Sequence, residues 1–155
     1  LKAPEFKLID QNGKVRTLQD FKNKVTLVVF AFSHCPSVCP GLVQLSKNIL
    51  ERIQDSHFQA LYITLDPARD TVSSLPALKE QWELPKNTTL LSGPVQDVNR
   101  VLDGFNIPHI ADSKTGDVTH PAILALMDQD LKIAYFFNKP KQQWVLDAAA
   151  NLLRE

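Results

Sequence analysis

Hydrophobic and polar positions along this chain follow two different periods. The segment 25–32, VTLVVFAF, is an almost unbroken apolar run rich in β-formers, which predicts a strand buried on both faces. In the segment 41–54 the apolar residues recur every three or four positions, which predicts an amphipathic helix. A further apolar run over 58–65 predicts a second strand, which ends at Asp66-Pro67.

The rest of the chain continues this alternation of strands and helices. Asn12-Gly13 is a strong two-residue turn signal and predicts a hairpin near the N-terminus. The further expected elements are hairpin strands at 4–10 and 15–18, helices at 73–82 and 94–105, a short strand at 90–91, a loop or hairpin at 107–119, strands at 122–127 and 131–137, and a helix at 141–153. Strand–helix alternation implies parallel pairing with right-handed crossovers, to which the last two strands add an antiparallel edge. We therefore expect an α/β, thioredoxin-like fold with an N-terminal β-hairpin and an insertion before the last two core strands.

Length and charge narrow the class of protein. The 155 residues are the size of one domain, so we expect a single domain over 1–155. Lys+Arg and Asp+Glu balance at 17 each, without a basic run, which argues against nucleic acid as a partner. No apolar stretch reaches the ~20 residues that span a bilayer. Membrane association is expected only through an anchor upstream of Leu1.

The chain has two cysteines, Cys35 and Cys39. They lie between a predicted buried strand and a predicted helix N-terminus, where the helix dipole and unpaired N–H groups favour the thiolate. A thiolate is both a nucleophile and a metal ligand, so the position alone leaves redox and metal chemistry open. Three residues separate the two thiols, whereas dithiol oxidoreductases usually have two. Residues at i and i+4 share a helix face, so both sulfurs can bind one ion.

A metal site needs at least one further ligand. Two thiolates suit Cu(I), and an added imidazole suits either oxidation state of copper, whereas zinc would need a fourth protein ligand. His120 opens the strand predicted over 122–127, and the start of that strand faces the cysteine segment in a thioredoxin-like plan. His34 is the alternative, although neighbours on an extended segment point in opposite directions. We therefore predict Cys35, Cys39 and His120 as metal ligands.

A charged turn follows the second predicted strand on the same side of the sheet. Asp66, Arg69 and Asp70 could form a docking surface there, or an ion pair that orders the loop beside the metal site. Turn chemistry at Asp66-Pro67 and Asp70-Thr71 explains the same residues without any role in function.

These motifs resemble those of the SCO/SenC proteins, which are thioredoxin-fold copper chaperones associated with cytochrome c oxidase assembly. The similarity runs almost end to end. It is carried by FKLID with NGK at 6–14, HCPSVCP at 34–40, LDPARDT at 65–71, and DVTH at 117–120 with Asp128 eight residues after the histidine. The combination is far more specific than the CxxxCP motif alone.

The resemblance implies that Cys35, Cys39 and His120 bind copper. It implies delivery of copper to the binuclear site of cytochrome c oxidase subunit II or another copper protein, or maintenance of the cysteines of that site. An upstream copper donor or a thiol reductase would then be a second partner. The expected location is the periplasm, the extracytoplasmic face of the inner membrane, or the mitochondrial intermembrane space.

Two departures from the family pattern affect the predicted site. Ser37 replaces an acidic residue that is usual beside the metal, and Pro121 follows His120 where a small polar residue is usual. A cis bond before Pro121 would aim the imidazole differently. The alternative function is a thiol–disulfide oxidoreductase in which Cys35 attacks and Cys39 resolves the mixed disulfide. Enzymatic turnover is required only by this alternative.

Overall fold

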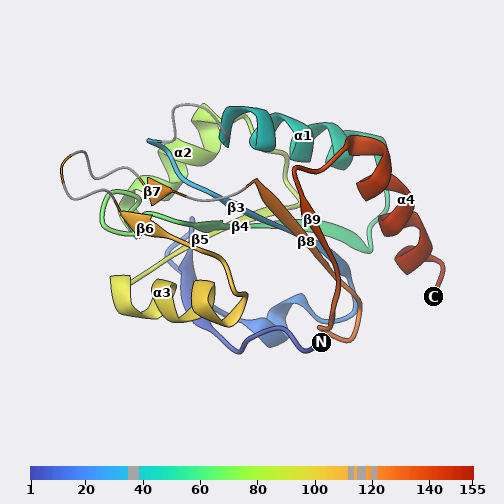
Figure 1. Cartoon of the computed structure of the whole chain (residues 1–155), viewed down its shortest axis with the longest axis horizontal. Helices are drawn as coiled ribbons and strands as arrows, with labels where there is room; N and C mark the ends of the chain where they lie inside the picture. The colour runs from blue at the N-terminus through green and yellow to red at the C-terminus, as the bar shows by residue number, and fades with distance from the viewer. Residues whose placement is uncertain (35–38, 112–113, 115–117, 120–121) are drawn as a thin grey trace.

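The computed structural model of the chain describes residues 1–34, 39–111, 114, 118–119 and 122–155. Its centre is a seven-stranded sheet in the order β2-β1-β5-β4-β3-β8-β9 (Figure 1). The strands of this sheet are β1 (Lys7–Asp10), β2 (Val15–Thr17), β3 (Val25–Ala31), β4 (Phe58–Thr64), β5 (Thr88–Ser92), β8 (Ile123–Met127) and β9 (Ile133–Asn138).

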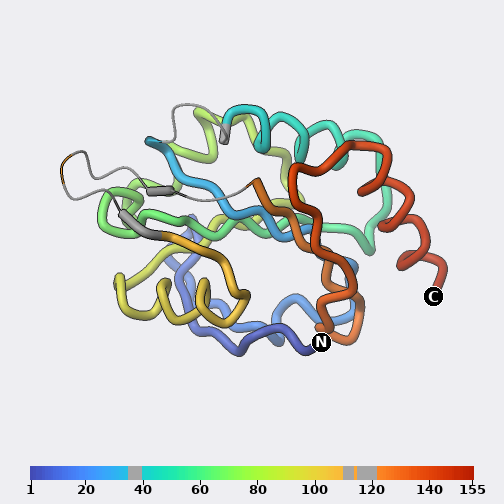
Figure 2. The backbone as a smooth tube through the Cα atoms, viewed as in Figure 1, coloured from blue at the N-terminus to red at the C-terminus, as the bar shows by residue number. Residues whose placement is uncertain are grey.

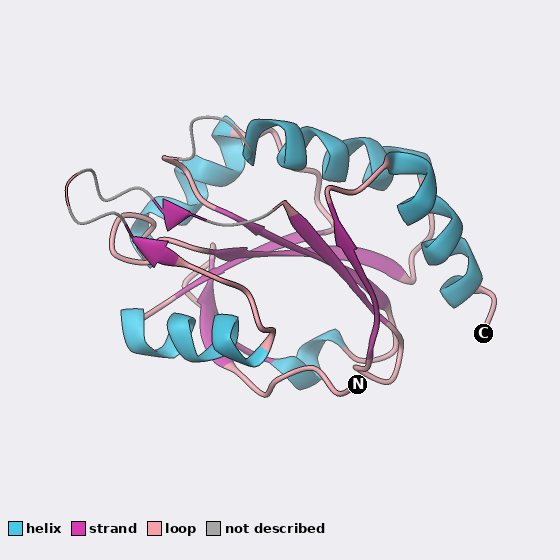
Figure 3. Cartoon of the chain, viewed as in Figure 1, coloured by secondary structure: helices cyan, strands magenta, loops and turns pink. Residues whose placement is uncertain are grey.

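Helices cover both faces of this sheet, with α1 and α4 along one face and α3 and η1 against the other (Figure 3). Over the described residues the α-helices are α1 (Cys39–Arg52), α2 (Leu75–Gln81), α3 (Val95–Gly104) and α4 (Gln142–Leu153). Two 3-10 turns are also present: η1 (Leu18–Phe21) lies between β2 and β3, and η2 (Val72–Ser74) directly precedes α2. The elements follow the predicted order, with boundaries shifted by one or two residues at most ends.

The central strands pair as the alternation predicted. β3 runs parallel to β4, and β4 runs parallel to β5, whereas β8 pairs antiparallel with β3 and β9 antiparallel with β8. Every residue of β3 is buried, which confirms the strand predicted to have two covered faces. The N-terminal hairpin joins the opposite edge, because β1 pairs antiparallel with β5.

Two segments differ from the expected elements in ways that concern the site. Helix α1 begins at Cys39 rather than at residue 41, because a helix tolerates a proline such as Pro40 in its first turn. The insertion over 107–119 contains two short strands, β6 (Ile110–Ala111) and β7 (Val118–Thr119), which pair antiparallel as a separate ribbon.

Candidate metal centre

The cysteine segment connects β3 to α1. The described chain ends on one side at His34, three residues after β3, and resumes at Cys39, the first residue of α1. Cys35 lies outside the described residues, as does Ser37. Because Cys39 is the first residue of α1, its backbone lies at a helix N-terminus. Free N–H groups and the helix dipole stabilise a thiolate at such a position.

The predicted third ligand, His120, lies between β7 and β8, outside the described residues. Strand register nevertheless relates it to the cysteine segment. Val29 of β3 pairs with Leu124 of β8 in antiparallel register. Cys35 follows Val29 by six residues, and His120 precedes Leu124 by four. Because β3 and β8 are antiparallel, the last residues of β3 and the first residues of β8 lie at the same end of the sheet (Figure 2).

The bond between His120 and Pro121 also lies outside the described residues, and the described part of the chain contains no cis peptide bond. The effect that a cis bond there would have on the direction of the imidazole therefore stays untested.

A buried carboxylate holds the chain just before the cysteine segment. Asp70, only 2% exposed, follows β4. It accepts hydrogen bonds from the Ser33 backbone N–H (3.0 Å), the Ser33 hydroxyl, and the Thr64 hydroxyl (2.8 Å). The Ser92 hydroxyl of β5 in turn donates to the Asp70 carbonyl. The entry to the cysteine segment is thus tied to the carboxyl ends of β4 and β5.

The other two residues of the charged turn stabilise that turn itself. The carbonyl of Asp66 accepts hydrogen bonds from the N–H groups of Arg69 (3.2 Å) and Asp70 (2.7 Å). The Asp66 carboxylate forms an ion pair with Arg69. The turn chemistry is therefore observed, whereas a docking role for Asp66, Arg69 and Asp70 stays a prediction. Sequence reasoning missed Ser33 and Thr64, because no local pattern relates them to Asp70.

A second polar contact fixes α1 on the sheet behind the cysteine segment. The Ser46 hydroxyl donates to the Val43 carbonyl (2.6 Å), so the Tyr62 hydroxyl of β4, also 2.6 Å from Ser46 Oγ, must be the donor of that pair. Burial raises the pKa of Tyr62 well above its usual range, and the phenol stays neutral. The first turns of α1 are thereby held against β4.

The described histidines occupy different surroundings. The exposed His34 has its Nδ1 2.9 Å from Ser33 Oγ. His109, in the segment before β6, has its Nε2 2.8 Å from a carboxylate oxygen of Asp103 in α3. His57, 71% exposed, lies beside Asp55 just before β4. Ser33 and His34 form a turn rather than an extended segment. Alternation of side chains along a strand therefore does not decide where His34 points.

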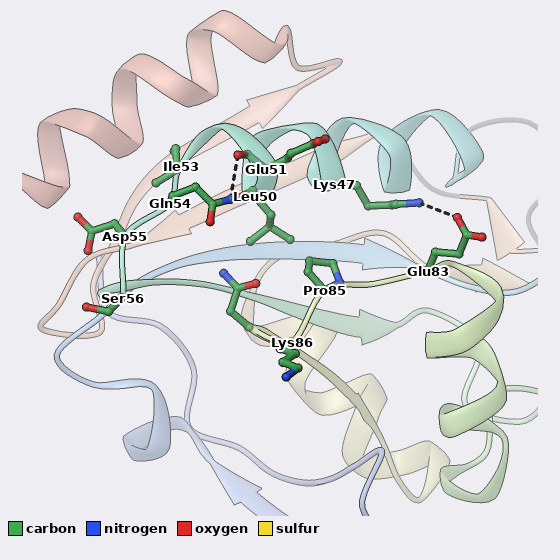
Figure 4. A pocket seen from close by; sticks show the side chains of 11 residues that line it. Lys47, Leu50, Glu51, Ile53, Gln54, Asp55, Ser56, Glu83, Pro85 and Lys86 are labelled. Atoms are coloured by element: carbon green, nitrogen blue, oxygen red, sulfur yellow. Dashed lines mark hydrogen bonds and ion pairs between the residues drawn. The ribbon is translucent and has the colours of Figure 1, made fainter.

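Within residues 1–34, 39–111, 114, 118–119 and 122–155, no group of three or more His, Cys, Asp or Glu side chains is arranged to hold a metal ion. A hollow of 610 Å³ lies between the end of α1 and the segment before β5 (Figure 4). Lys47 and Glu83 form an ion pair across it, 3.8 Å apart. Its lining has no thiol or imidazole, and Cys35, Cys39 and His120 stay a prediction as metal ligands.

The fold is that of a thioredoxin-like domain, and the two cysteines of the chain fall in the sequence between β3 and the start of α1. Solved structures agree. The copper-bound ScoI of Bradyrhizobium japonicum is 31% identical with a TM-score of 0.83, and the match covers 99% of each chain. The copper-bound ScoI of Arabidopsis thaliana gives a TM-score of 0.89 at 22% identity, again over 99% of each chain. The latter likeness concerns the fold alone.

The family model SCO1/SenC matches residues 1–153. The chain belongs to the SCO1/SenC family. Protein sco1 of Schizosaccharomyces pombe is 31% identical over 143 residues, which cover 86% of this chain and 54% of that protein. The mitochondrial SCO2 homolog of Bos taurus is 27% identical over 145 residues, 88% of this chain and 54% of the relative. The chain thus spans about half the length of these relatives.

Other relatives include an SCO2-like protein of Rickettsia typhi, 29% identical over 85% of this chain and 68% of its own length. None of the helices in the described part of the chain is long and apolar enough to cross a bilayer.

Proposed function

We propose that this chain is a copper chaperone that binds one copper ion through the thiolates of Cys35 and Cys39 and the imidazole of His120. The pairing of Val29 with Leu124 carries the proposal. It sets the end of β3, which the cysteine segment follows in the sequence, beside the start of β8, which His120 precedes. Two soft thiolates and one imidazole form a donor set that suits copper. The copper-bound ScoI of B. japonicum, 31% identical to this chain, supports the same conclusion.

Delivery requires that a partner's ligands replace those of the chaperone. The proposed acceptor is the binuclear copper site of cytochrome c oxidase subunit II or another copper protein, with an upstream donor or thiol reductase that loads or reduces this chain. Support comes from a relative described as a member of a family of cytochrome c oxidase assembly proteins. The proposed location is extracytoplasmic, in keeping with mitochondrial and lipoprotein relatives.

The test is competition for copper between the reduced protein and a chromophoric chelator. We expect one copper per chain, with an affinity at least tenfold lower in His120→Ala and far lower in Cys39→Ser. His57→Ala is the matched control, because that imidazole is exposed near the other end of the sheet. Copper binding that is unchanged by His120→Ala would contradict the three-ligand site.

A thiol–disulfide oxidoreductase is the second candidate. It is favoured by the position of Cys39 at the first turn of α1, where the thiolate is stabilised. A disulfide switch has been described for the related BsSco. This function predicts that His120→Ala leaves the rate of reduction of a model disulfide unchanged, whereas Cys35→Ser abolishes it.

A further inference from the structure

Strand β9 forms an exposed edge of the sheet on the side of β8 (Figure 1). Tyr135 is 37% exposed and Phe136 is 44% exposed, and the rings of Tyr135 and Phe137 stack with centroids 5.9 Å apart. The strand IAYFFN contains no charge and no proline. Edge strands usually carry charged residues or proline, because an open apolar edge pairs readily with other chains.

The first part of this edge is already paired. The N–H of Ile133 donates to the carbonyl of Leu1 (2.7 Å), and the N–H of Ala3 donates to the carbonyl of Leu131 (3.1 Å). This antiparallel bridge shows that the outer edge of β9 accepts a further strand. Over the described residues, no strand continues this pairing beside 134–138.

Lysines flank the open part of the edge at both ends. Lys132 precedes β9, Lys139 and Lys141 follow it, and the segment 131–141 contains no acidic residue. In an antiparallel pair of two β9 strands centred on residues 135 and 136, Lys132 of each copy would face Lys139 of the other. Like charges directly opposite destabilise a strand pair. Charge therefore favours a partner strand with acidic ends over a second copy of this chain.

The open edge ends beside the proposed metal site. Asn138 pairs with Ile123, so the end of β9 lies beside the start of β8. Ile123 follows His120 by three residues in the sequence. A hollow of 330 Å³ continues from Lys139 and Pro140 across to the first turns of α1. A strand added to β9 would lie three strand spacings from β3, about 14 Å. Four or five extended residues cover that distance.

We infer that the outer edge of β9, residues 134–138 with Lys139 and Lys141, is the docking site for an extended segment of the copper acceptor that has acidic ends. The segment pairs with β9 as an eighth strand, and the residues beyond it cross the hollow to the copper ligands. This inference rests on the proposed delivery function, whose acceptor it describes.

The test uses two synthetic peptides, Glu-Thr-Val-Thr-Val-Thr-Glu and the same peptide with Lys at both ends. Amide hydrogen exchange of the reduced protein is followed with each peptide. We expect the acidic peptide to slow exchange in 134–138 at least tenfold at saturation, and the Lys peptide to bind at least tenfold more weakly. Equal effects of both peptides, or protection elsewhere, would overturn the inference.

Variants test the same surface with the copper-binding domain of cytochrome c oxidase subunit II. Phe136→Lys is expected to slow copper transfer at least tenfold, with copper affinity unchanged. Val15→Lys is the matched control, since Val15 is 49% exposed on β2 at the opposite edge of the sheet. Normal transfer by Phe136→Lys refutes the docking site and leaves delivery intact. Absence of transfer from the wild type, with the acidic peptide still bound at β9, refutes this delivery target instead.

Self-association is checked separately by sedimentation of the wild type. A dimer that is lost in Phe136→Lys would show that β9 pairs with a second copy, and the inference of an acidic partner would be wrong.

Discussion

Replacement of Asp70 by alanine tests whether the buried carboxylate holds the entry to the cysteine segment. Of the described residues, Ser33 donates to it twice and Thr64 once. Hydrogen bonds to a charged group contribute about 1.5 to 3 kcal/mol each, and a buried donor left alone costs about 1 to 3 kcal/mol. Ser33 is half-buried, so its donors regain hydrogen bonds to water and add little to the loss. Thr64 is buried, so both its lost hydrogen bond and its unpaired donor count. We expect Asp70→Ala to lower the free energy of unfolding by about 3 to 4 kcal/mol, which most domains survive.

Asp70→Asn separates hydrogen bonding from charge. The asparagine oxygen can take the position of Oδ2, which accepts from the Ser33 N–H and the Thr64 hydroxyl. Its NH₂ group then faces Ser33 Oγ, which can accept instead of donating. We expect a loss of only about 1 to 2 kcal/mol, because neutral hydrogen bonds contribute less than charged ones.

Urea unfolding of the reduced, copper-free protein measures both losses. Asp130→Ala is the matched control, because Asp130 is exposed in the turn before β9, and such surface changes stay within about 0.5 kcal/mol. Loss of the Asp70 carboxylate should also weaken copper binding about tenfold. Ser33 would then be ordered only when copper binds, and fixing the backbone of one residue costs about 1 to 2 kcal/mol. The reasoning is refuted if Asp70→Ala is no more destabilising than the control.

Three further predictions concern stability alone and are read from urea unfolding curves. Burial would raise the pKa of Asp10, but hydrogen bonds from two backbone N–H groups of the hairpin turn and from a guanidinium outweigh it and lower the pKa. Asp10→Asn should therefore cost about 1 to 2 kcal/mol at neutral pH, and this difference should shrink as the pH falls below about 4. Tyr62→Phe leaves Ser46 without its donor and should cost about 1 kcal/mol, with unchanged copper affinity. Gly104→Ala should cost about 1 to 3 kcal/mol in spite of the better helix propensity, because the new Cβ would lie 2.5 Å from Cβ of Pro4.

Local signals in the sequence were sufficient for most of the fold. Asn12-Gly13 predicted a hairpin, and Gly13 indeed has a positive φ of 74° in the turn between β1 and β2. The apolar run over 25–32 predicted the fully buried strand β3. Such features are decided by neighbouring residues, through turn geometry and the period of apolar positions.

Contacts between distant residues could not be predicted in this way. Ser33 and Asp70 are 37 residues apart, and only the parallel pairing of β3 with β4 brings them together. The position of β1 beside β5 likewise depends on which sheet edge remains open. For the candidate site, chemistry and resemblance selected the ligands, whereas the supporting contacts appeared only in three dimensions.

Among the described residues, the contacts that anchor the chain before and after the cysteine segment come from the side of β4. On the side of β4, Asp70 binds the chain entering the segment, and Tyr62 contacts the middle of α1 at Ser46. On the side of β8 lie the expected position of His120, the hollow beside Pro140, and the edge of β9, where no described strand pairs with 134–138. Ligand exchange needs a donor site that keeps its shape while a partner approaches from one direction. If the cysteine segment were anchored toward β8 instead, the incoming segment would have to displace that anchor before it reached the copper. The anchor on β4 lies on the side away from the inferred approach of the acceptor.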